Sequence, residues 1–172
     1  VGDPTSELTE VGPAEEVDGQ PKRGTMVQFW PDPDIFTETV DFEYEKLMTR
    51  IRELAFLNPG LKITLFDERF ERSDSFLYEG GIKSFVEFLN TGKQPLHEEP
   101  VLVRGKKQIN EEEMVEVEVG LQWTGSYQEN VHSFVNNINT LEGGTHVSGL
   151  RAALTRTLNN YAHANMFSIS NV

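Results

Sequence analysis

The segment 133–159 holds the residues of this sequence that are best spaced for chemistry. Within it, the letters EGGTH at 142–146 precede a run with helical periodicity, and backbone N–H groups at a helix start favour phosphate and other anions. The same glycine pair followed by a hydroxyl is also typical of a tight turn with a helix cap. We therefore interpret the segment first as a turn in which Thr145 or Ser148 caps the helix, and keep an anion site as the alternative.

Other catalytic patterns fit the sequence less well. Histidines 97, 132, 146 and 163 are too scattered to form a zinc set, and the glycine pairs lack the spacing of a phosphate loop or a dinucleotide fingerprint. The hydroxyls near His146 lack a nucleophile elbow, so helix caps explain them better than acyl transfer. Asp32 and Asp34 stand in a proline-rich turn, where they favour turn formation over cation binding.

Charge restricts how the chain can contact nucleic acid. The formal net charge is −13; residues 1–80 hold 8 Lys+Arg and 18 Asp+Glu, and the remainder holds 7 and 10. Phosphate binding depends on basic side chains, so this acidic surface is not expected to grip DNA by itself. Arg151 and Arg156 lie outside the apolar face of the helix predicted after Gly144, and they remain available for such contacts.

Composition indicates a soluble globular chain of one or two domains, and the periodicity of its apolar residues indicates the α+β class. Hydrophobic residues make up 37% of it, there is no cysteine, and no apolar run is long enough to span a membrane. We therefore expect a cytoplasmic protein. Val1 is not methionine, which favours a piece of a longer protein over a processed start.

The first half predicts an irregular, mobile stretch, a strand, a helix and a hairpin. Proline, glycine and carboxylates fill residues 1–23, whereas 24–29 alternate as in a strand. From Asp41 to Asn58 a helix is expected, with a charged face that we interpret as solvated. Its apolar face consists of Tyr44, Leu47, Met48, Ile51, Leu54 and Ala55. Segments 61–66 and 75–78 predict an antiparallel hairpin.

The second half predicts a short helix, a meander and a long helix. Gly80-Gly81 breaks the chain before a helix at 82–89, and strands are expected at 101–103 and 115–123, joined by a charged turn at 105–113. A further strand is expected over 131–138. The last helix should pack on a sheet with the face formed by Val147, Leu150, Leu154, Leu158 and Tyr161.

Four ordered blocks of the sequence resemble the bacterial DNA gyrase B family, and the paralogous topoisomerase IV protein shares much of this pattern. The resemblance extends from Gly24 to about Tyr161. The blocks are GTMVQFWPD at 24–32 followed by IF at 35–36, RELAFLN at 52–58, YEGGIKSFV at 78–86 and SFVNNINTLEGGTH at 133–146.

The resemblance implies two partial domains. Residues 1–80 would be the C-terminal part of an α/β-sandwich ATPase domain of the GHKL type, with 1–23 as a mobile segment after the ATP lid. Residues 81–172 would begin a transducer domain that resembles ribosomal protein S5. The tail 163–172 does not resemble the family's charged continuation.

The resemblance also implies a function for the full-length protein, an ATP-hydrolysing DNA topoisomerase that uses ATP and Mg²⁺, acts on DNA with gyrase A and dimerises through its ATPase domain. Thr25 matches the threonine that helps to hold adenine, although an ordinary strand residue is the simpler interpretation. Arg151 and Arg156 would face the cavity that admits DNA. The family's catalytic base and metal-binding residues match no position here, so we expect the chain alone to be inactive and to bind no ATP tightly. A non-catalytic interaction module is the alternative.

Overall fold

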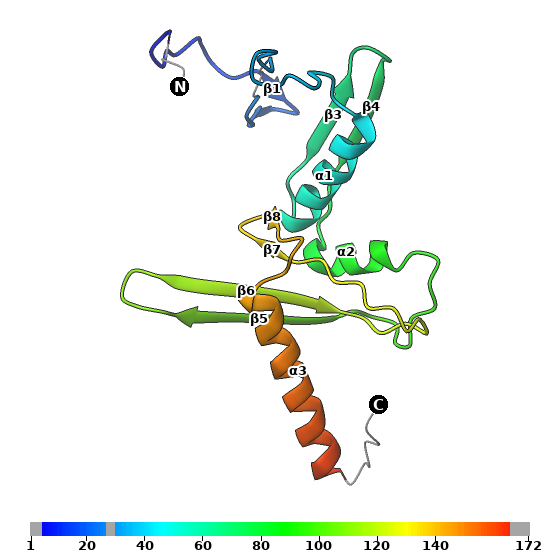
Figure 1. Cartoon of the computed structure of the whole chain (residues 1–172). Coiled ribbons are helices and arrows are strands. Elements are labelled where there is room, and N and C mark those ends of the chain that lie inside the picture. Colours follow the sequence, from blue (N-terminus) through cyan, green and yellow to red (C-terminus); the bar gives the residue numbers. More distant parts are fainter. Residues whose placement is uncertain (1–4, 27–29, 166–172) are drawn as a thin grey trace. The chain divides into compact units, whose positions relative to one another are not determined.

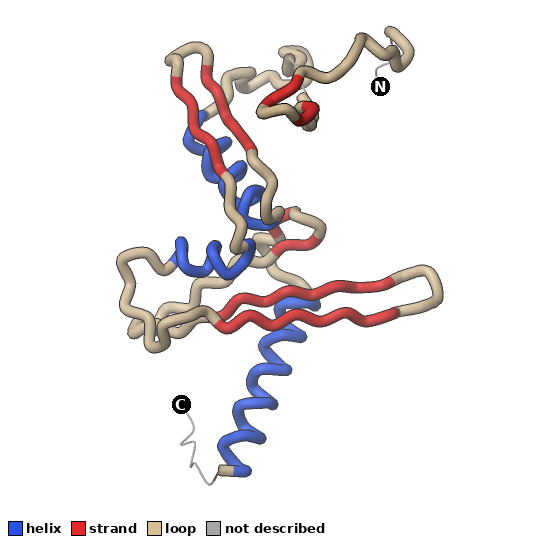
Figure 2. The backbone as a smooth tube through the Cα atoms, turned by 180° about the vertical axis from the view of Figure 1, so that it is seen from behind, coloured by secondary structure: helices blue, strands red, loops and turns tan. Residues whose placement is uncertain are grey.

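The computed structural model describes residues 5–26 and 30–165. The chain forms two compact units, residues 1–42 and residues 43–172, and each has its own internal contacts. Helices and small antiparallel sheets alternate along it (Figure 1), which confirms the α+β class. Among the described residues every sheet has two strands, and Figure 2 shows these strands in pairs.

Within the described residues of the first unit, β1 (Glu16–Val17) and β2 (Gln20–Pro21) form a hairpin. Asp18 and Gly19 between them have φ values of 53° and 74°, as a two-residue hairpin turn requires. The other residues of 5–23 have no regular secondary structure, in agreement with the mostly irregular stretch expected there. The strand expected over 24–29 is not found at residues 24–26, and residues 27–29 lie outside the described part of the chain.

The turn at Asp32 is confirmed. The Asp34 backbone N–H donates to Asp32 Oδ1 at 2.9 Å, and the Ile35 N–H donates to the Asp32 carbonyl at 3.0 Å. The carboxylate thus replaces a backbone acceptor within the turn.

Helix α1 (Tyr44–Leu57) begins the second unit, three residues later than expected from Asp41. Its predicted apolar face is half-buried or buried, and Ala55 and Phe56 are almost fully enclosed. The opposite face is only partly solvated, because Arg50, Arg52 and Glu53 are half-buried and have specific partners. The prediction of a uniformly solvated charged face is wrong for these three residues.

The predicted hairpin is confirmed as β3 (Ile63–Asp67) and β4 (Arg72–Phe76), in antiparallel register from Ile63 opposite Phe76 to Asp67 opposite Arg72. Asp67 is 8% exposed and accepts two hydrogen bonds from the Arg69 guanidinium, at 2.9 and 2.8 Å. These bonds hold the pKa of the Asp67 carboxyl below its usual value. A buried charge at the hairpin turn is therefore paired.

Polar contacts attach the start of α1 to β4. The Tyr44 hydroxyl donates to Asp74 at 2.5 Å, and Arg72 lies over the Tyr44 ring at 4.0 Å while pairing with Glu45 at 2.6 Å. Burial raises the pKa of the Tyr44 hydroxyl, and the hydrogen bond to Asp74 raises it further. The helix and the hairpin are thus joined by side chains as well as by their apolar faces.

Helix α2 (Gly81–Leu89) is found at the predicted position and packs on β6. Strands β5 (Val101–Gln108) and β6 (Met114–Leu121) pair along their whole length, so the charged turn expected over 105–113 is confined to 109–113. Residues 105–108 have few apolar side chains, and cross-strand pairing rather than burial extends the strand. Arg104 and Lys106 pair with Glu118 and Glu116 on β6.

The expected strand over 131–138 and the meander are both wrong. The chain forms a separate tight hairpin there, β7 (Phe134–Val135) and β8 (Ile138–Asn139). Asn136 and Asn137 turn the chain with φ values of 49° and 65°, which asparagine tolerates better than most residues. The β-branched residues on both sides of this pair are favoured in strands, so the sequence pattern predicted one continuous strand in place of the turn.

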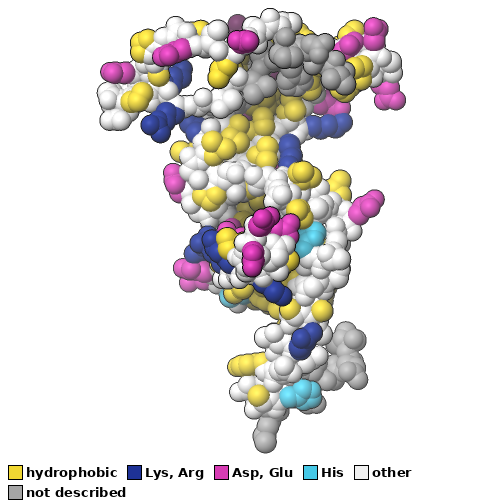
Figure 3. All heavy atoms as spheres, turned by 90° about the vertical axis from the view of Figure 1, so that its left-hand side faces the viewer, with side chains coloured by type: hydrophobic (Ala, Val, Ile, Leu, Met, Phe, Trp, Pro, Cys, Tyr) yellow, Lys and Arg dark blue, Asp and Glu magenta, His cyan; other side chains and the backbone are white. Residues whose placement is uncertain are grey.

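Helix α3 (Thr145–Ala164) ends the described chain. Its predicted apolar face is only partly covered: Leu158 is 49% and Tyr161 63% exposed, so the expected packing of the whole face on a sheet is not found among the described residues. Figure 3 shows hydrophobic side chains at the surface of this helix, in the lower part of the view. Two-stranded sheets offer too little area to cover a helix of five turns. Of the atypical tail, residues 163 and 164 belong to α3, and 166–172 lie outside the described residues.

Candidate functional site

A cluster of aromatic rings joins residues on both sides of the Gly80-Gly81 break. Phe56 at the end of α1 is 1% exposed and stacks on Tyr78 with ring centroids 3.6 Å apart. Its ring also lies 5.0 Å from that of Phe85 and 5.4 Å from that of Phe88, both on α2. Ring pairs of this kind contribute both apolar burial and a preferred geometry. The end of α1 is therefore packed firmly on α2.

The ring cluster continues into the segment before β7. The ring of Phe85 lies 5.5 Å from that of His132 in an edge-on arrangement and 6.2 Å from that of Phe134 on β7. Arg52 adds a cation to the cluster, with its guanidinium carbon 5.1 Å from the centre of the Phe76 ring and 5.2 Å from that of Phe88. Parts of the chain that are about 80 residues apart in sequence thus contact one another through these rings.

A hydroxyl network connects the base of the β7–β8 hairpin with the first turn of α3. Ser133 Oγ and Thr140 Oγ1 lie 2.6 Å apart, and Thr140 Oγ1 lies 3.2 Å from His146 Nε2. The Thr140 N–H also donates to the Ser133 carbonyl at 2.8 Å. Ser133 and His146 are therefore linked through Thr140 and serve to position the helix start.

The EGGTH segment forms the expected tight turn, but its caps differ. Gly143 has a φ of 75°, and its N–H donates to the Thr140 carbonyl at 2.8 Å. Gly144 is the N-cap, and a Cβ there would lie 2.9 Å from the His146 ring. Neither predicted hydroxyl caps the helix, because Thr145 is already its first residue and Ser148 Oγ donates to the Gly144 carbonyl. Glycine is needed here for close approach as well as for its conformation.

The three predicted site residues fall in two units: Thr25 belongs to residues 1–42, and the two arginines belong to residues 43–172. Thr25 is exposed in a segment without regular secondary structure, in the unit of residues 1–42. Arg151 pairs with Glu129 at 2.9 Å, whereas Arg156 forms no ion pair with any described residue. The two arginines are five residues apart on α3, which separates them by about 140° around the helix axis at 3.6 residues per turn. They do not share one helix face.

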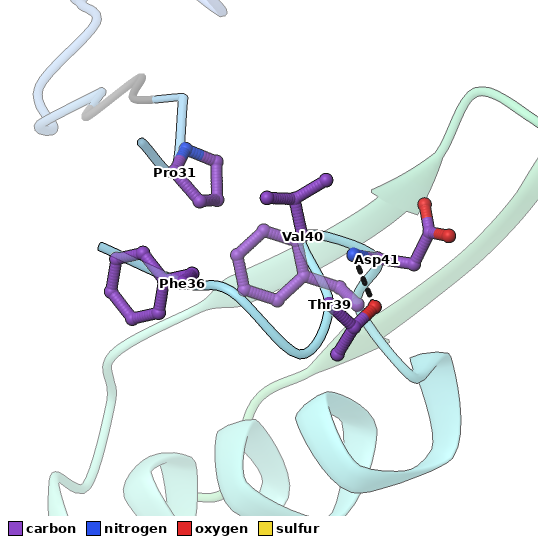
Figure 4. A pocket seen from close by; sticks show the side chains of 6 residues that line it. Pro31, Phe36, Thr39, Val40 and Asp41 are labelled. Atoms are coloured by element: carbon purple, nitrogen blue, oxygen red, sulfur yellow. Dashed lines mark hydrogen bonds between the residues drawn. The ribbon is translucent and has the colours of Figure 1, made fainter. Parts of the chain in front are cut away.

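A small depression lies within the first unit. Its volume is about 130 Å³, and mostly apolar side chains line it (Figure 4): Pro31, Phe36, Thr39, Val40, Asp41 and Phe42. The Asp41 N–H donates to Thr39 Oγ1 at 3.0 Å and closes one edge. This volume is too small for a nucleotide. Within 5–26 and 30–165, no three or more Asp, Glu and His side chains lie close enough together to hold a metal ion.

Comparison with known proteins identifies the family. A family model described as DNA gyrase B matches residues 81–171, more than half of the chain. The chain belongs to the DNA gyrase B family. The resemblance carried by the four sequence blocks is thereby confirmed.

Relatives in the gyrase B family are similar over most of this chain. The DNA gyrase B of Streptococcus pyogenes serotype M1 is 56% identical over 144 residues, which cover 83% of this chain and 21% of that relative. The DNA gyrase B of Bacillus mycoides is 48% identical over 165 residues, covering 95% and 38%. The chain therefore spans about a fifth to two fifths of the length of these relatives.

Solved structures of the family share the fold. The 43K ATPase domain of Thermus thermophilus gyrase B, solved in complex with an aminocoumarin, matches with a TM-score of 0.64 and 37% identity over 83% of this chain and 37% of that chain. The DNA gyrase B of Myxococcus xanthus matches with a TM-score of 0.67 and 27% identity, over 86% and 42%. No helix within the described part of this gyrase B family member is both long and apolar enough to cross a membrane.

The sequence did not lead us to predict that Phe56 and His132 belong to the ring cluster. Phe56 is absent from the apolar positions predicted to face the core, and His132 was considered only as a metal ligand. The turn between β7 and β8 could have been predicted from the sequence. Asn136 and Asn137 stand between β-branched residues, and two adjacent residues that tolerate positive φ predict a tight hairpin.

Proposed function

We propose that this chain is part of a DNA gyrase B protein, which couples ATP binding and hydrolysis to DNA strand passage and negative supercoiling. Membership of the family supports the proposal, as does the similarity to a solved ATPase domain of gyrase B. The single observation that carries the chain's own role is the ring cluster around Phe56, which makes one packed joint of α1, α2 and β7. Such a joint is suited to transmit a change of state along the protein.

The assignment of the chain to two domains is also a proposal. Residues 1–80 would be the end of the ATPase domain, with 1–23 following the lid, and residues 81–172 would begin the transducer domain. The family-model match that starts at Gly81 supports this boundary. The glycine pair supports it too, since Gly81 has a φ of 59° and turns the chain into α2.

ATP and Mg²⁺ would bind the full-length protein, with Thr25 near the adenine. Thr25 is exposed, and no three acidic or histidine side chains of the described residues lie close enough together to hold a metal ion. We expect the 172 residues alone not to hydrolyse ATP. DNA, gyrase A and a second copy of the full-length protein would be the partners, in the cytoplasm.

The activity is tested with the full-length protein and gyrase A on relaxed circular DNA. Negative supercoils are expected with ATP and not without it, because strand passage against torsional stress needs a source of free energy. Gel electrophoresis of the DNA and a parallel assay of phosphate release measure the two processes. Decatenation without negative supercoiling would instead indicate the topoisomerase IV paralogue, and inhibition of full-length gyrase B by a chain that never hydrolyses ATP would indicate an interaction module.

The same assay tests the arginines of α3. If Arg151 and Arg156 contact a passing DNA segment, the double variant R151A/R156A is expected to supercoil more slowly and with a shallower dependence on salt, since each lost phosphate contact lowers the salt slope by about one. K106A/K107A on the β5–β6 hairpin is the matched control for net charge. An unchanged salt dependence in R151A/R156A would show that these residues do not contact the DNA.

A further inference from the structure

The tip of the β7–β8 hairpin contacts the last turns of α1 through three polar residues. The Arg50 guanidinium donates to the backbone carbonyl of Asn137, and the Asn137 side-chain amide donates to Asn58 Oδ1 at 3.1 Å. These partners are 87 and 79 residues apart in sequence. We call the set Arg50, Asn58 and Asn137 the hairpin-tip contact.

The two members of the hairpin-tip contact on the α1 side are each held in place by a second interaction. Arg50 also pairs with Glu53 at 2.9 Å, and the side chain of Glu53 is 16% exposed. The Asn58 side chain donates to the Leu54 carbonyl at 2.7 Å and so closes the end of α1. These second bonds restrict the rotamers of Arg50 and Asn58, so both side chains are already oriented toward the hairpin.

The β7–β8 hairpin connects the hairpin-tip contact with the start of α3. Strand β8 separates Asn137 from Thr140, and Thr140 bonds to both Ser133 and His146. The Gly143-Gly144 turn that follows is stabilised by the bond to the Thr140 carbonyl. Three consecutive sets of hydrogen bonds therefore connect the end of α1 with the first turn of α3.

We propose that Arg50, Asn58 and Asn137 are positioning residues that link the end of α1 to the start of α3 through the β7–β8 hairpin. The ring cluster holds α1 against α2 and β7 mainly by apolar burial, and its ring contacts tolerate a range of centroid distances. Hydrogen bonds to a hairpin tip are directional, so they select one orientation of the hairpin. This inference rests on the proposed function, since the orientation of α3 would report the nucleotide state to the remainder of the protein.

The test is the number of supercoils that the full-length protein and gyrase A introduce per ATP hydrolysed. In R50Q/N137G this ratio is expected to fall about tenfold while ATP hydrolysis stays within about twofold, because loss of hydrogen bonds to a charged group in a coupling element changes coupling by roughly that factor. Glycine keeps the left-handed backbone at position 137, so the variant removes the amide without straining the turn. Asn136→Gly is the matched control, because it lies in the same turn with a φ of 49° and its side chain bonds to none of the described residues.

An unchanged ratio in R50Q/N137G would overturn the inference, whether both rates keep their values or both fall in proportion. A proportional fall would indicate a merely structural contact. If the unmodified protein shows no ATP-dependent supercoiling, the proposed function fails, and hydrogen exchange at residues 145–152 decides the positioning role. Faster exchange there in R50Q/N137G but not in Asn136→Gly supports it, and equal exchange in both overturns it.

Discussion

Replacing Phe56 with alanine is expected to lower the free energy of unfolding by about 3–5 kcal/mol, the usual cost of deleting a buried phenylalanine ring. Phe56 is 1% exposed and its ring contacts those of Tyr78, Phe85 and Phe88. Its removal leaves a cavity where α1 and α2 meet. Urea unfolding followed by circular dichroism measures the change through the midpoint and slope of the transition.

Phe66→Ala is the matched control for Phe56→Ala. Phe66 lies on the outward face of β3 and is 57% exposed, so its loss is expected to cost well under half as much, about 1 kcal/mol or less. Equal losses in the two variants would contradict the central place of Phe56 in the core. In the full-length protein the Phe56 variant is also expected to lose supercoiling, because the joint that it fills would loosen.

Replacing Gly120 with valine is expected to destabilise the protein by about 1–3 kcal/mol through overpacking. Strand propensity alone predicts the opposite, since valine is favoured in strands over glycine. A Cβ at position 120 would lie 2.8 Å from Val86 Cγ2 and 2.9 Å from Ile82 Cγ2, both on α2. The helix therefore needs a residue without a side chain at this point of β6.

Gly105→Val supplies the control within the same hairpin. Gly105 is on β5, and a Cβ there would meet nothing within 4 Å, so the variant is expected to be neutral or slightly stabilising. Thermal unfolding of both variants compares them directly. Similar melting temperatures for the two would contradict the close packing of α2 on β6.

Local periodicity was enough to predict the helices and one hairpin of this chain. The helices at 44–57, 81–89 and 145–164 and the hairpin of β3 and β4 follow from apolar spacing and from glycines at their ends. The sequence blocks also identified the family, because several ordered motifs together are far more specific than any one glycine pair. These features need no knowledge of distant contacts.

Only the tertiary structure shows which side chains from distant parts of the chain contact one another. Arg50 resembled any cation on a solvated helix face until its guanidinium was found bonded to Asn137, and strand propensity alone does not show that α2 covers Gly120. The single strand expected over 131–138 divided into a hairpin because Asn136 and Asn137 adopt left-handed backbone conformations that strand propensity does not predict. Periodicity reports which face of an element is apolar, whereas the partner of that face depends on packing between residues that are far apart in the chain.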